Sequence, residues 1–320
     1  MNKFSENIGI VGQGFVGTAV KEKFKDYYNV YTYDKYSGEK SRVFAMDQVS
    51  ENEIDLATLV KQCETVFVCV PTPMFPNGQC DTSIVDEVIL RISNISTELD
   101  RRTAIVVKST IPPGTTRSLD LEYDNVTISF SPEFLTEANS IEDFKNQNRI
   151  ILGIDWIEYV EPLTAIFRKV FPEAEIAVMR SDEAEMSKYM INLFLATKVS
   201  FFNDMYKVIE KMNNDSSSIN MSFEAIVGAA LMDPRIGKSH YMVPGPDGDY
   251  GYGGHCFPKD MAAILHIADT LKLSVPTLLG ASTTNSIVRR NRDWENMPGR
   301  AVSVIEEESE IELDDIENEL

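Results

Sequence analysis

The glycine turn near the N-terminus restricts the fold of this chain more than any other feature. A short apolar segment, residues 8–11, runs directly into Gly-Gln-Gly-Phe-Val-Gly at residues 12–17, and residues 18–24 have helical character. A second apolar segment, residues 30–33, ends at Asp34. A G-x-G-x-x-G motif between a strand and a helix, with an acid after the next strand, is typical of a dinucleotide-binding fold.

Each glycine of this motif has its own task. Gly12 makes the turn, Gly14 lets a pyrophosphate approach the backbone, and Gly17 packs the helix on the strand. The helix amino end then attracts phosphate. Asp34 can accept hydrogen bonds from ribose hydroxyls and would repel a 2′-phosphate, so the sequence predicts NAD rather than NADP, a preference that Lys35 weakens. The remaining predicted cofactor contacts in the turn are Gln13, Phe15 and Val16.

Beyond the turn, predicted strands and helices alternate up to about residue 180. This alternation indicates a doubly wound parallel sheet, in which ligands bind at the carboxyl ends of the strands. Polar loops fall at three of these ends, at residues 71–73, 109–115 and 131–137. Strands are expected at residues 65–70, 104–108, 126–130 and 150–153, and helices at 56–62, 84–95 and 159–170.

From Asp182 to about Met212, apolar residues recur every three or four positions, which predicts one long helix. Lys188 and Asn192 are four residues apart on it, so they share one face and can reach the same ligand. Shorter helices are expected at residues 223–231, 261–271 and 283–292. The predicted architecture is α/β, with a Rossmann-type domain at 1–180, an all-helical central domain at 181–304 and an acidic disordered tail at 305–320.

Composition excludes several classes of function. The net charge of −20, nine charges of which lie in residues 306–320, argues against binding to nucleic acid or to anionic lipid. No apolar run is long enough to span a membrane, and the few, irregularly spaced cysteines without a signal sequence indicate a cytoplasmic protein. No metal site is expected, because the spacing of the three histidines fits none.

A second glycine-rich stretch, residues 251–254, leads to Cys256. Glycines allow a ligand to approach the backbone closely. Cys256 lies just before a predicted helix start, where amide groups and Lys259 favour a thiolate, and Asp260 follows one turn later and could move a proton beside the sulfur. Alternatively Cys256 is a small buried residue in a turn, which is the reading we expect for Cys69 in its valine strand.

Seven motifs occur in a fixed order over about the first 290 residues. They are the glycine turn at 12–17, Val-Pro-Thr-Pro at 70–73, Lys-Ser-Thr-Ile-Pro-Pro-Gly-Thr at 108–115, Ser-Pro-Glu-Phe-Leu at 131–135, Ser187-Lys188 with Asn192, Asp-Pro-Arg-Ile-Gly at 233–237, and Gly-Gly-His-Cys-Phe-Pro-Lys-Asp at 253–260. Together they resemble the UDP-glucose/GDP-mannose dehydrogenase family. The resemblance implies oxidation of a sugar C6 alcohol to a carboxylate with two NAD and no free aldehyde.

The resemblance also implies roles for matching residues. Cys256 would capture the aldehyde as a thiohemiacetal and then carry a thioester. The implied catalytic set is Cys256, Lys188, Asn192, Asp260, Glu133 and Thr110, with Glu133 and Thr110 holding the hydrolytic water. The implied NAD contacts outside the glycine turn are Asp34, Thr72, Pro73, Thr110, Glu137 and Lys259. The implied substrate contacts are Glu133, Phe134, Leu135, Lys188, Asn192, Tyr252, Gly253 and Arg235, the last across a dimer interface.

The family normally continues with a further domain that grips the nucleotide, whereas this sequence becomes acidic after residue 305. We therefore expect a short-form nucleotide-sugar dehydrogenase that forms a homodimer through the long helix. Two alternatives remain. One is a hydroxyacid dehydrogenase with a single hydride transfer, which would have no use for Cys256 or Glu133. The other is a protein that binds NAD or a partner without turnover.

Overall fold

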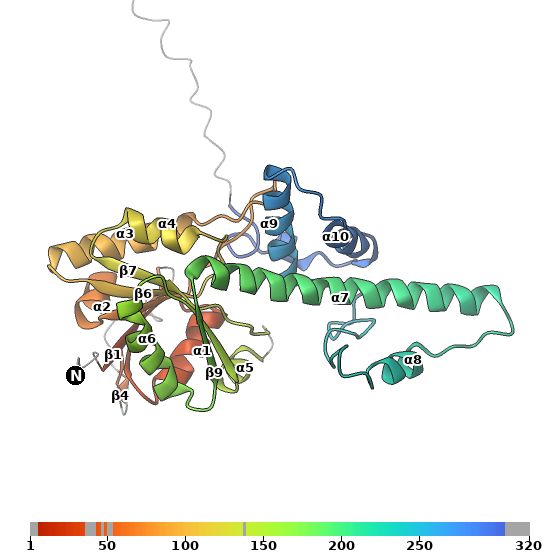
Figure 1. Ribbon diagram of the computed structural model, residues 1–320, viewed down its shortest axis with the longest axis horizontal. Helices are drawn as coiled ribbons and strands as arrows, with labels where there is room; N and C mark the ends of the chain where they lie inside the picture. The colour runs from red at the N-terminus through yellow and green to blue at the C-terminus, as the bar shows by residue number, and fades with distance from the viewer. Residues whose placement is uncertain (1–5, 36–42, 46–47, 50–53, 137–138, 305–320) are drawn as a thin grey trace, which may run out of the picture.

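The structure, a computed structural model, describes residues 6–35, 43–45, 48–49, 54–136 and 139–304. A sheet covered by helices forms one end of the molecule, and the long helix α7 (Ser181–Asp215) projects from it and carries the remaining helices (Figure 1). The predicted acidic tail and the predicted cofactor contact Glu137 lie outside the described residues.

The sheet has nine strands within the described residues, in the order β4-β3-β2-β1-β5-β6-β7-β8-β9. Pairing is parallel from β2 through β1, β5 and β6 to β7, and antiparallel at β2–β3, β3–β4 and β7–β8. The strands are β1 (Asn7–Val11), β2 (Asn29–Tyr33), β3 (Val43–Ala45), β4 (Gln48–Val49), β5 (Thr65–Val68), β6 (Thr103–Val107), β7 (Val126–Phe130), β8 (Arg149–Gly153) and β9 (Glu175–Met179). The predicted Rossmann-type fold is confirmed, with antiparallel additions toward both edges.

The strand order reverses at β1, which lies between β2 and β5. Chain connections leave β1 in opposite directions at such a switch point, so a crevice opens beyond the carboxyl ends of the two strands. Val11 ends β1 and Val68 ends β5, and both the glycine turn and the polar loop at residues 71–73 follow these ends directly. The fold therefore brings two predicted cofactor-binding segments together.

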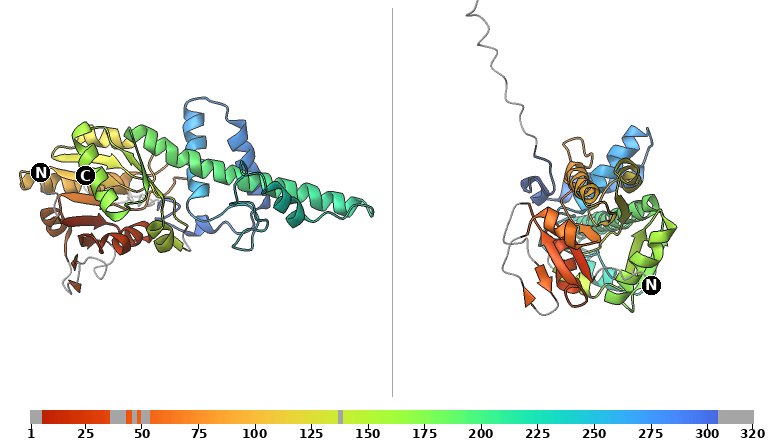
Figure 2. Two further views of the ribbon diagram at one scale, coloured as in Figure 1. Left: turned by 60° about the horizontal axis from the view of Figure 1, so that its bottom comes forward. Right: turned by 90° about the vertical axis from the view of Figure 1, so that its left-hand side faces the viewer.

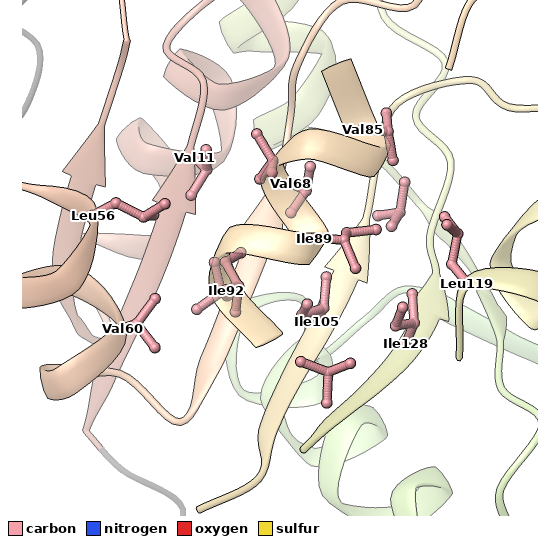
Figure 3. Close-up of a cluster of buried hydrophobic side chains, with 14 of the residues drawn as sticks. Val11, Leu56, Val60, Val68, Val85, Ile89, Ile92, Ile105, Leu119 and Ile128 are labelled. Atoms are coloured by element: carbon pink, nitrogen blue, oxygen red, sulfur yellow. The ribbon is translucent and has the colours of Figure 1, made fainter. Parts of the chain in front are cut away.

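Helices cover both faces of the sheet, because its central strands are apolar on both sides. On one face, Val68 and Ile105 of the strands pack against Ile89 and Ile92 of α3 (Figure 3). On the other face, aromatic side chains such as Phe24 fill the space beneath α1 and α6. The helices in this domain are α1 (Phe15–Phe24), α2 (Leu56–Gln62), α3 (Ser83–Glu98), α4 (Thr115–Glu122), α5 (Ser140–Lys145) and α6 (Ile157–Val170).

Helix α7 begins against the sheet and then leaves it (Figure 2). A Cβ at Gly153 would lie 2.7 Å from the Cα of Ser181 and 2.8 Å from the Cβ of Ala184, so only glycine allows the helix to pack this closely on β8. Helices α9 and α10 pack along α7 on one side and α8 lies on another (Figure 1). These helices are α8 (Phe223–Ala230), α9 (Phe257–Thr270), α10 (Pro276–Val288) and the short 3-10 helix η3 (Asp293–Asn296).

Helix α10 begins at Pro276, earlier than the predicted start near residue 283, because proline is favoured in a first helical turn. Helix α9 likewise starts at Phe257 with Pro258 in its first turn. Among the helices that the structure describes, including α7 with its 35 residues, none is both long and apolar enough to cross a membrane.

Candidate active site

The three glycines of the N-terminal turn have three different surroundings. Gly12 has φ +90°, and a Cβ there would lie 2.5 Å from the carbonyl oxygen of Cys69. A Cβ at Gly17 would lie 1.9 Å from the carbonyl oxygen of Gly12. A Cβ at Gly14 would have no neighbour within 4 Å. The first and third glycines are thus required by the turn and its packing, and the second leaves open backbone at the amino end of α1 for a phosphate.

Asp34 follows β2 and lies beside this turn. Its Oδ2 accepts a hydrogen bond from the Gln13 amide at 2.8 Å, which holds the carboxylate at the cavity wall. The neighbouring Lys35 forms an ion pair with Glu87 of α3, with 3.1 Å between Nζ and Oε1. Because that cation already has an anionic partner, it is poorly placed to attract a 2′-phosphate, and the carboxylate of Asp34 favours NAD.

A cavity of about 780 Å³ lies at the carboxyl ends of β1, β5 and β6. This volume is within the range of small-molecule and cofactor sites. Both the glycine turn and the segment that begins α9 contribute to its wall. The predicted site residues that line it are Gly12, Gln13, Gly14, Phe15, Val16, Asp34, Thr72, Thr110, Glu133, Cys256, Lys259 and Asp260.

Cys256 stands at the N-cap of α9 and is partly exposed, whereas Cys63, Cys69 and Cys80 are buried. Its carbonyl oxygen accepts the Asp260 amide at 2.9 Å, which closes the first helical turn. Burial raises the pKa of Cys69 to about 12, so that thiol is inert. The accessible sulfur is therefore the one at the start of a helix.

Asp260 is buried in a hydrogen-bonded cluster. Its Oδ1 lies 2.9 Å from Lys259 Nζ, and its Oδ2 accepts from Asn192 Nδ2 at 2.6 Å. Burial opposes protonation of Lys259, but the carboxylate beside it raises the pKa of Lys259 above its ordinary value. A buried ion pair is better tolerated when the carboxylate has further hydrogen-bond donors, and Asn192 is such a donor to Asp260. Asn192 thus acts on the cavity through Asp260 and does not line it.

Lys188 of α7 does not itself line the main cavity, but it contacts Glu133, a lining residue in the loop after β7. Its Nζ donates to the Glu133 carbonyl oxygen, lies 3.5 Å from Glu133 Oε1 and is 4.9 Å from the centre of the Phe134 ring. The other carboxylate oxygen, Oε2, is buried without a hydrogen-bond partner. An ionised carboxylate accepts hydrogen bonds on both oxygens, so Glu133 has one acceptor left for a water or a hydroxyl in the cavity.

Several predicted contacts lie away from the cavity. Arg235 is exposed and pairs with its near neighbour Asp233, with 2.5 Å between Nη2 and Oδ2. Tyr252 and Pro73 are buried, and Leu135 and Phe134 border a second, smaller cavity of about 390 Å³ beside α5. Gly253 packs against Arg289. The single chain does not bring these residues into the main cavity.

Lys108 and Arg300 are two of the cavity residues to which the sequence analysis gave no role. Lys108 ends the strand segment before a predicted loop, and its Nζ donates to the Ser131 carbonyl oxygen at 2.7 Å; burial lowers its pKa to about 8. The guanidinium carbon of Arg300 lies 4.9 Å from the centre of the Phe15 ring. The position of Lys108 at the end of a predicted strand could have marked it as a site residue, whereas no sequence feature marks Arg300.

Two family models match the chain. The UDP-glucose/GDP-mannose dehydrogenase family NAD binding domain matches residues 39–171, and the central domain of the same family matches residues 182–286. The chain belongs to the UDP-glucose/GDP-mannose dehydrogenase family. The family's N-terminal domain is an NAD binding domain, and the cofactor of this chain is therefore NAD.

Two relatives of the chain carry the name UDP-glucose 6-dehydrogenase, one of them as a putative enzyme. The chain is 28% identical over 279 residues to the putative UDP-glucose 6-dehydrogenase YtcA of Bacillus subtilis (strain 168), covering 82% of this chain and 61% of that protein. It is 32% identical over 239 residues to the UDP-glucose 6-dehydrogenase of Rickettsia bellii (strain RML369-C), covering 73% of this chain and 50% of that one. The chain thus spans about half to three-fifths of the length of these relatives.

Among solved structures, a UDP-glucose dehydrogenase from the hyperthermophilic archaeon Pyrobaculum islandicum superposes with a TM-score of 0.72 at 25% identity, covering 89% of this chain and 69% of that one. A Mycobacterium tuberculosis 3-hydroxyisobutyrate dehydrogenase superposes with a TM-score of 0.63 at 15% identity, covering 89% of this chain and 94% of that one. The second likeness concerns the fold alone.

Proposed function

We propose that this family member is an NAD-dependent nucleotide-sugar dehydrogenase that oxidises the C6 alcohol of UDP-glucose, or of a related nucleotide sugar, to the uronic acid. One observation supports this most: Cys256 lines the same cavity as the glycine turn and Asp34. A single hydride transfer has no use for a thiol at that place. A four-electron oxidation can use a thiol, because the aldehyde has to be held between the first and the second hydride transfer.

In this proposal, NAD held at the glycine turn and Asp34 would supply the hydride acceptor for both oxidations of the C6 carbon. The Cys256 sulfur bonds to the aldehyde carbon formed by the first oxidation, and the carbonyl oxygen gains a proton, which gives a thiohemiacetal. Loss of that proton and of a hydride gives a thioester. Asp260, held by Lys259 and Asn192, would accept the thiol proton, and Lys188 would stabilise negative charge on the oxygen.

Water must then break the carbon–sulfur bond, releasing the carboxylate and the free thiol. The buried and unpartnered Oε2 of Glu133 suits the task of taking a proton from that water. The Nζ of its neighbour Lys188 lies 3.5 Å from the other oxygen, so the two oxygens of this carboxylate have different surroundings. Thr110, in the loop after β6, would help hold the water at the same wall of the cavity.

We further propose that the chain forms a homodimer through α7. Helix α7 carries a row of exposed apolar side chains at spacings of three, four or seven residues, and such rows on a soluble protein mark interaction sites. In the assembly, Arg235 of one chain would reach the phosphate of a substrate held by the other. The exposed members of the row are Met186, Met190, Phe194, Phe201, Met205, Val208 and Met212.

The stoichiometry of cofactor reduction tests the function. The purified protein is given NAD and a panel of UDP- and GDP-sugars, and reduced cofactor is counted against uronate formed. We expect two NADH per uronate. One NADH per sugar would indicate a single-hydride dehydrogenase, and NAD binding without turnover on any sugar of the panel would indicate a binding protein.

The variant Cys256→Ser tests the thiol. Acid formation should fall by about a thousandfold or more, since the covalent route is lost, while the affinity for NAD stays within about twofold because Cys256 does not hold the glycine turn. The NAD affinity thus reports that the variant is folded. Undiminished uronate output would remove Cys256 from the mechanism.

A further inference from the structure

The turn that precedes Cys256 has most of its backbone amides bound by side chains from distant parts of the chain. Loop amides are more commonly bound to water or to nearby backbone. Here the partners come from the middle of α7, from α10 and from η3, so three separate elements converge on four residues. The bonds are Gly251 N to Asn203 Oδ1 at 3.1 Å, Tyr252 N to Asn285 Oδ1 at 2.7 Å, and Gly254 N to the two oxygens of Asp293 at 3.1 and 3.2 Å.

Asn285 and Arg289 lie one turn apart at the end of α10 and both face this turn. Asn285 also donates its Nδ2 to the Tyr252 carbonyl oxygen at 3.0 Å, so it binds both the N–H and the C=O of one residue. A Cβ at Gly251 would lie 2.2 Å from Asn285 Oδ1, and a Cβ at Gly253 would lie 2.1 Å from Arg289 Nη2. The glycines are therefore needed for contact with these side chains.

Arg289 is a buried cation at the centre of an ionic cluster. Its guanidinium lies 2.6 Å from Asp247, 3.6 Å from Asp249 and 3.4 Å from Asp293, and its Nε donates to the Asn291 carbonyl oxygen at 2.7 Å. Its side chain is only 2% exposed. The three carboxylates are more exposed than the guanidinium, and the planar fork of arginine can bind several of them at once.

The cluster acts on Cys256 through a short chain of contacts. Arg289 holds Asp293, Asp293 binds the amide of Gly254, and Gly254 is two residues from Cys256. Helix α9 fixes the distance from the thiol to Asp260, whereas this turn determines where the start of α9 lies against the cavity. The family match ends at residue 286, so Arg289 and Asp293 lie beyond it.

We propose that Asn285, Arg289 and Asp293 are positioning residues for Cys256, which hold its turn so that the thiol stays at the cavity wall. The catalytic consequence rests on the function proposed above. The effect on the reactivity of the Cys256 thiol does not depend on that function, because in this proposal the turn sets the accessibility of Cys256 whether or not the protein turns over a sugar.

The test compares Arg289→Met with a matched control, Arg292→Gln, which removes an exposed arginine that pairs only with Glu295 among the described residues. The second-order rate of alkylation by iodoacetamide is followed by mass spectrometry of the Cys256 peptide. The other thiols are buried and report unfolding if they become labelled. We expect alkylation of Cys256 to accelerate several-fold in Arg289→Met, kcat to fall about a hundredfold, and NAD affinity to change less than about twofold.

Two further variants keep the test decisive if Arg289→Met does not fold. Arg289→Lys retains the charge but loses the fork, and should give a smaller change in the same direction. Gly253→Ala forces the guanidinium away from the turn and should have an effect like that of Arg289→Met. The control should match the wild type.

Unchanged alkylation of Cys256 in Arg289→Lys and Gly253→Ala would overturn the proposal, and so would faster alkylation with an unchanged kcat. If the wild type shows no turnover, the dehydrogenase function fails, and the alkylation rates alone then decide whether these residues position the thiol.

Discussion

At Glu133, one carboxylate oxygen lies near Lys188 and the other is buried without a partner. If Oε2 takes a proton from the hydrolytic water, Glu133→Gln should slow the last step most. A thioester should then accumulate, visible as added mass on the Cys256 peptide during turnover. The double variant with Cys256→Ser is the control and should carry no adduct. Absence of the adduct in the single variant under slow turnover would assign the water to another residue.

Arg300 places a cation at the cavity wall beside Phe15, the first residue of α1, where the open backbone at Gly14 suits a pyrophosphate. Arg300→Gln should weaken NAD binding about tenfold, since it removes a charge-assisted contact. The affinity is measured by calorimetry without any sugar. Arg292→Gln, a change of the same kind away from the cavity, should have no effect, and an unchanged affinity in Arg300→Gln would exclude Arg300 from the cofactor site.

Among the elements, α7 and α4 are joined by one buried carboxylate. Glu185 of α7 accepts from the Gly114 amide at 2.5 Å, the Thr116 amide at 2.8 Å and Thr116 Oγ1 at 2.5 Å, all at the start of α4. Its side chain is fully buried, and burial raises its pKa from 4.5 to about 7 against the effect of these donors. The same face of α7 carries Lys188 about one turn later, so this contact helps place that lysine beside Glu133.

The raised pKa of Glu185 predicts a pH dependence of stability. Between pH 4.5 and about 7 the folded state binds more protons at this group than the unfolded state, so its contribution to the free energy of unfolding is largest below pH 4.5 and is lost as the pH rises through 7. The loss amounts to about 3 kcal/mol. Urea unfolding of the wild type and of the neutral variant Glu185→Gln should therefore show a difference that shifts by about this amount across that range. A difference independent of pH would contradict the prediction.

At the scale of the whole molecule, the row of apolar side chains on α7 remains exposed to solvent in the single chain. Phe201 is 57% exposed and lies in the middle of the row. Phe201→Asp should convert a dimer to a monomer in light scattering, because a charge would be buried at the centre of the contact. Leu279→Asp on α10, with a similar exposure of 58%, is the control and should leave the dimer intact. A monomeric wild type, or an equal effect of the control, would place the interface elsewhere.

The described part of the chain after η3 returns to the first domain. The Met74 amide binds the Ala301 carbonyl oxygen, the Ser303 amide binds the Met74 carbonyl oxygen, and Ser303 Oγ lies 2.9 Å from Asp81 Oδ2. This return carries Arg300 to the cavity. The helical part therefore touches the Rossmann-type domain at several places, among them the beginning of α7, the start of α9 and the segment near residue 301.

The sequence alone determined the sheet and the positions of its ligand-binding ends. Continuous apolar segments separated by helical patterns specify buried parallel strands, and Gly12 and Gly17 mark a turn that other residues cannot adopt, because these are local properties of the backbone and of side-chain periodicity. Short or exposed elements such as β9, α4 and α5 were not predicted, since they carry too little apolar periodicity to be distinguished from loops.

Only the tertiary structure decided which side chains surround Cys256. The cluster of Arg289 with Asp293, the contact of Asn192 with Asp260, and the place of Arg300 join residues that are far apart in the chain. No local pattern encodes these contacts, because they depend on how α9, α10 and the residues after η3 pack on α7 and on the sheet. The sequence could therefore predict a cofactor site and a candidate thiol, whereas the groups that surround the turn before this thiol emerged from the packing of helices.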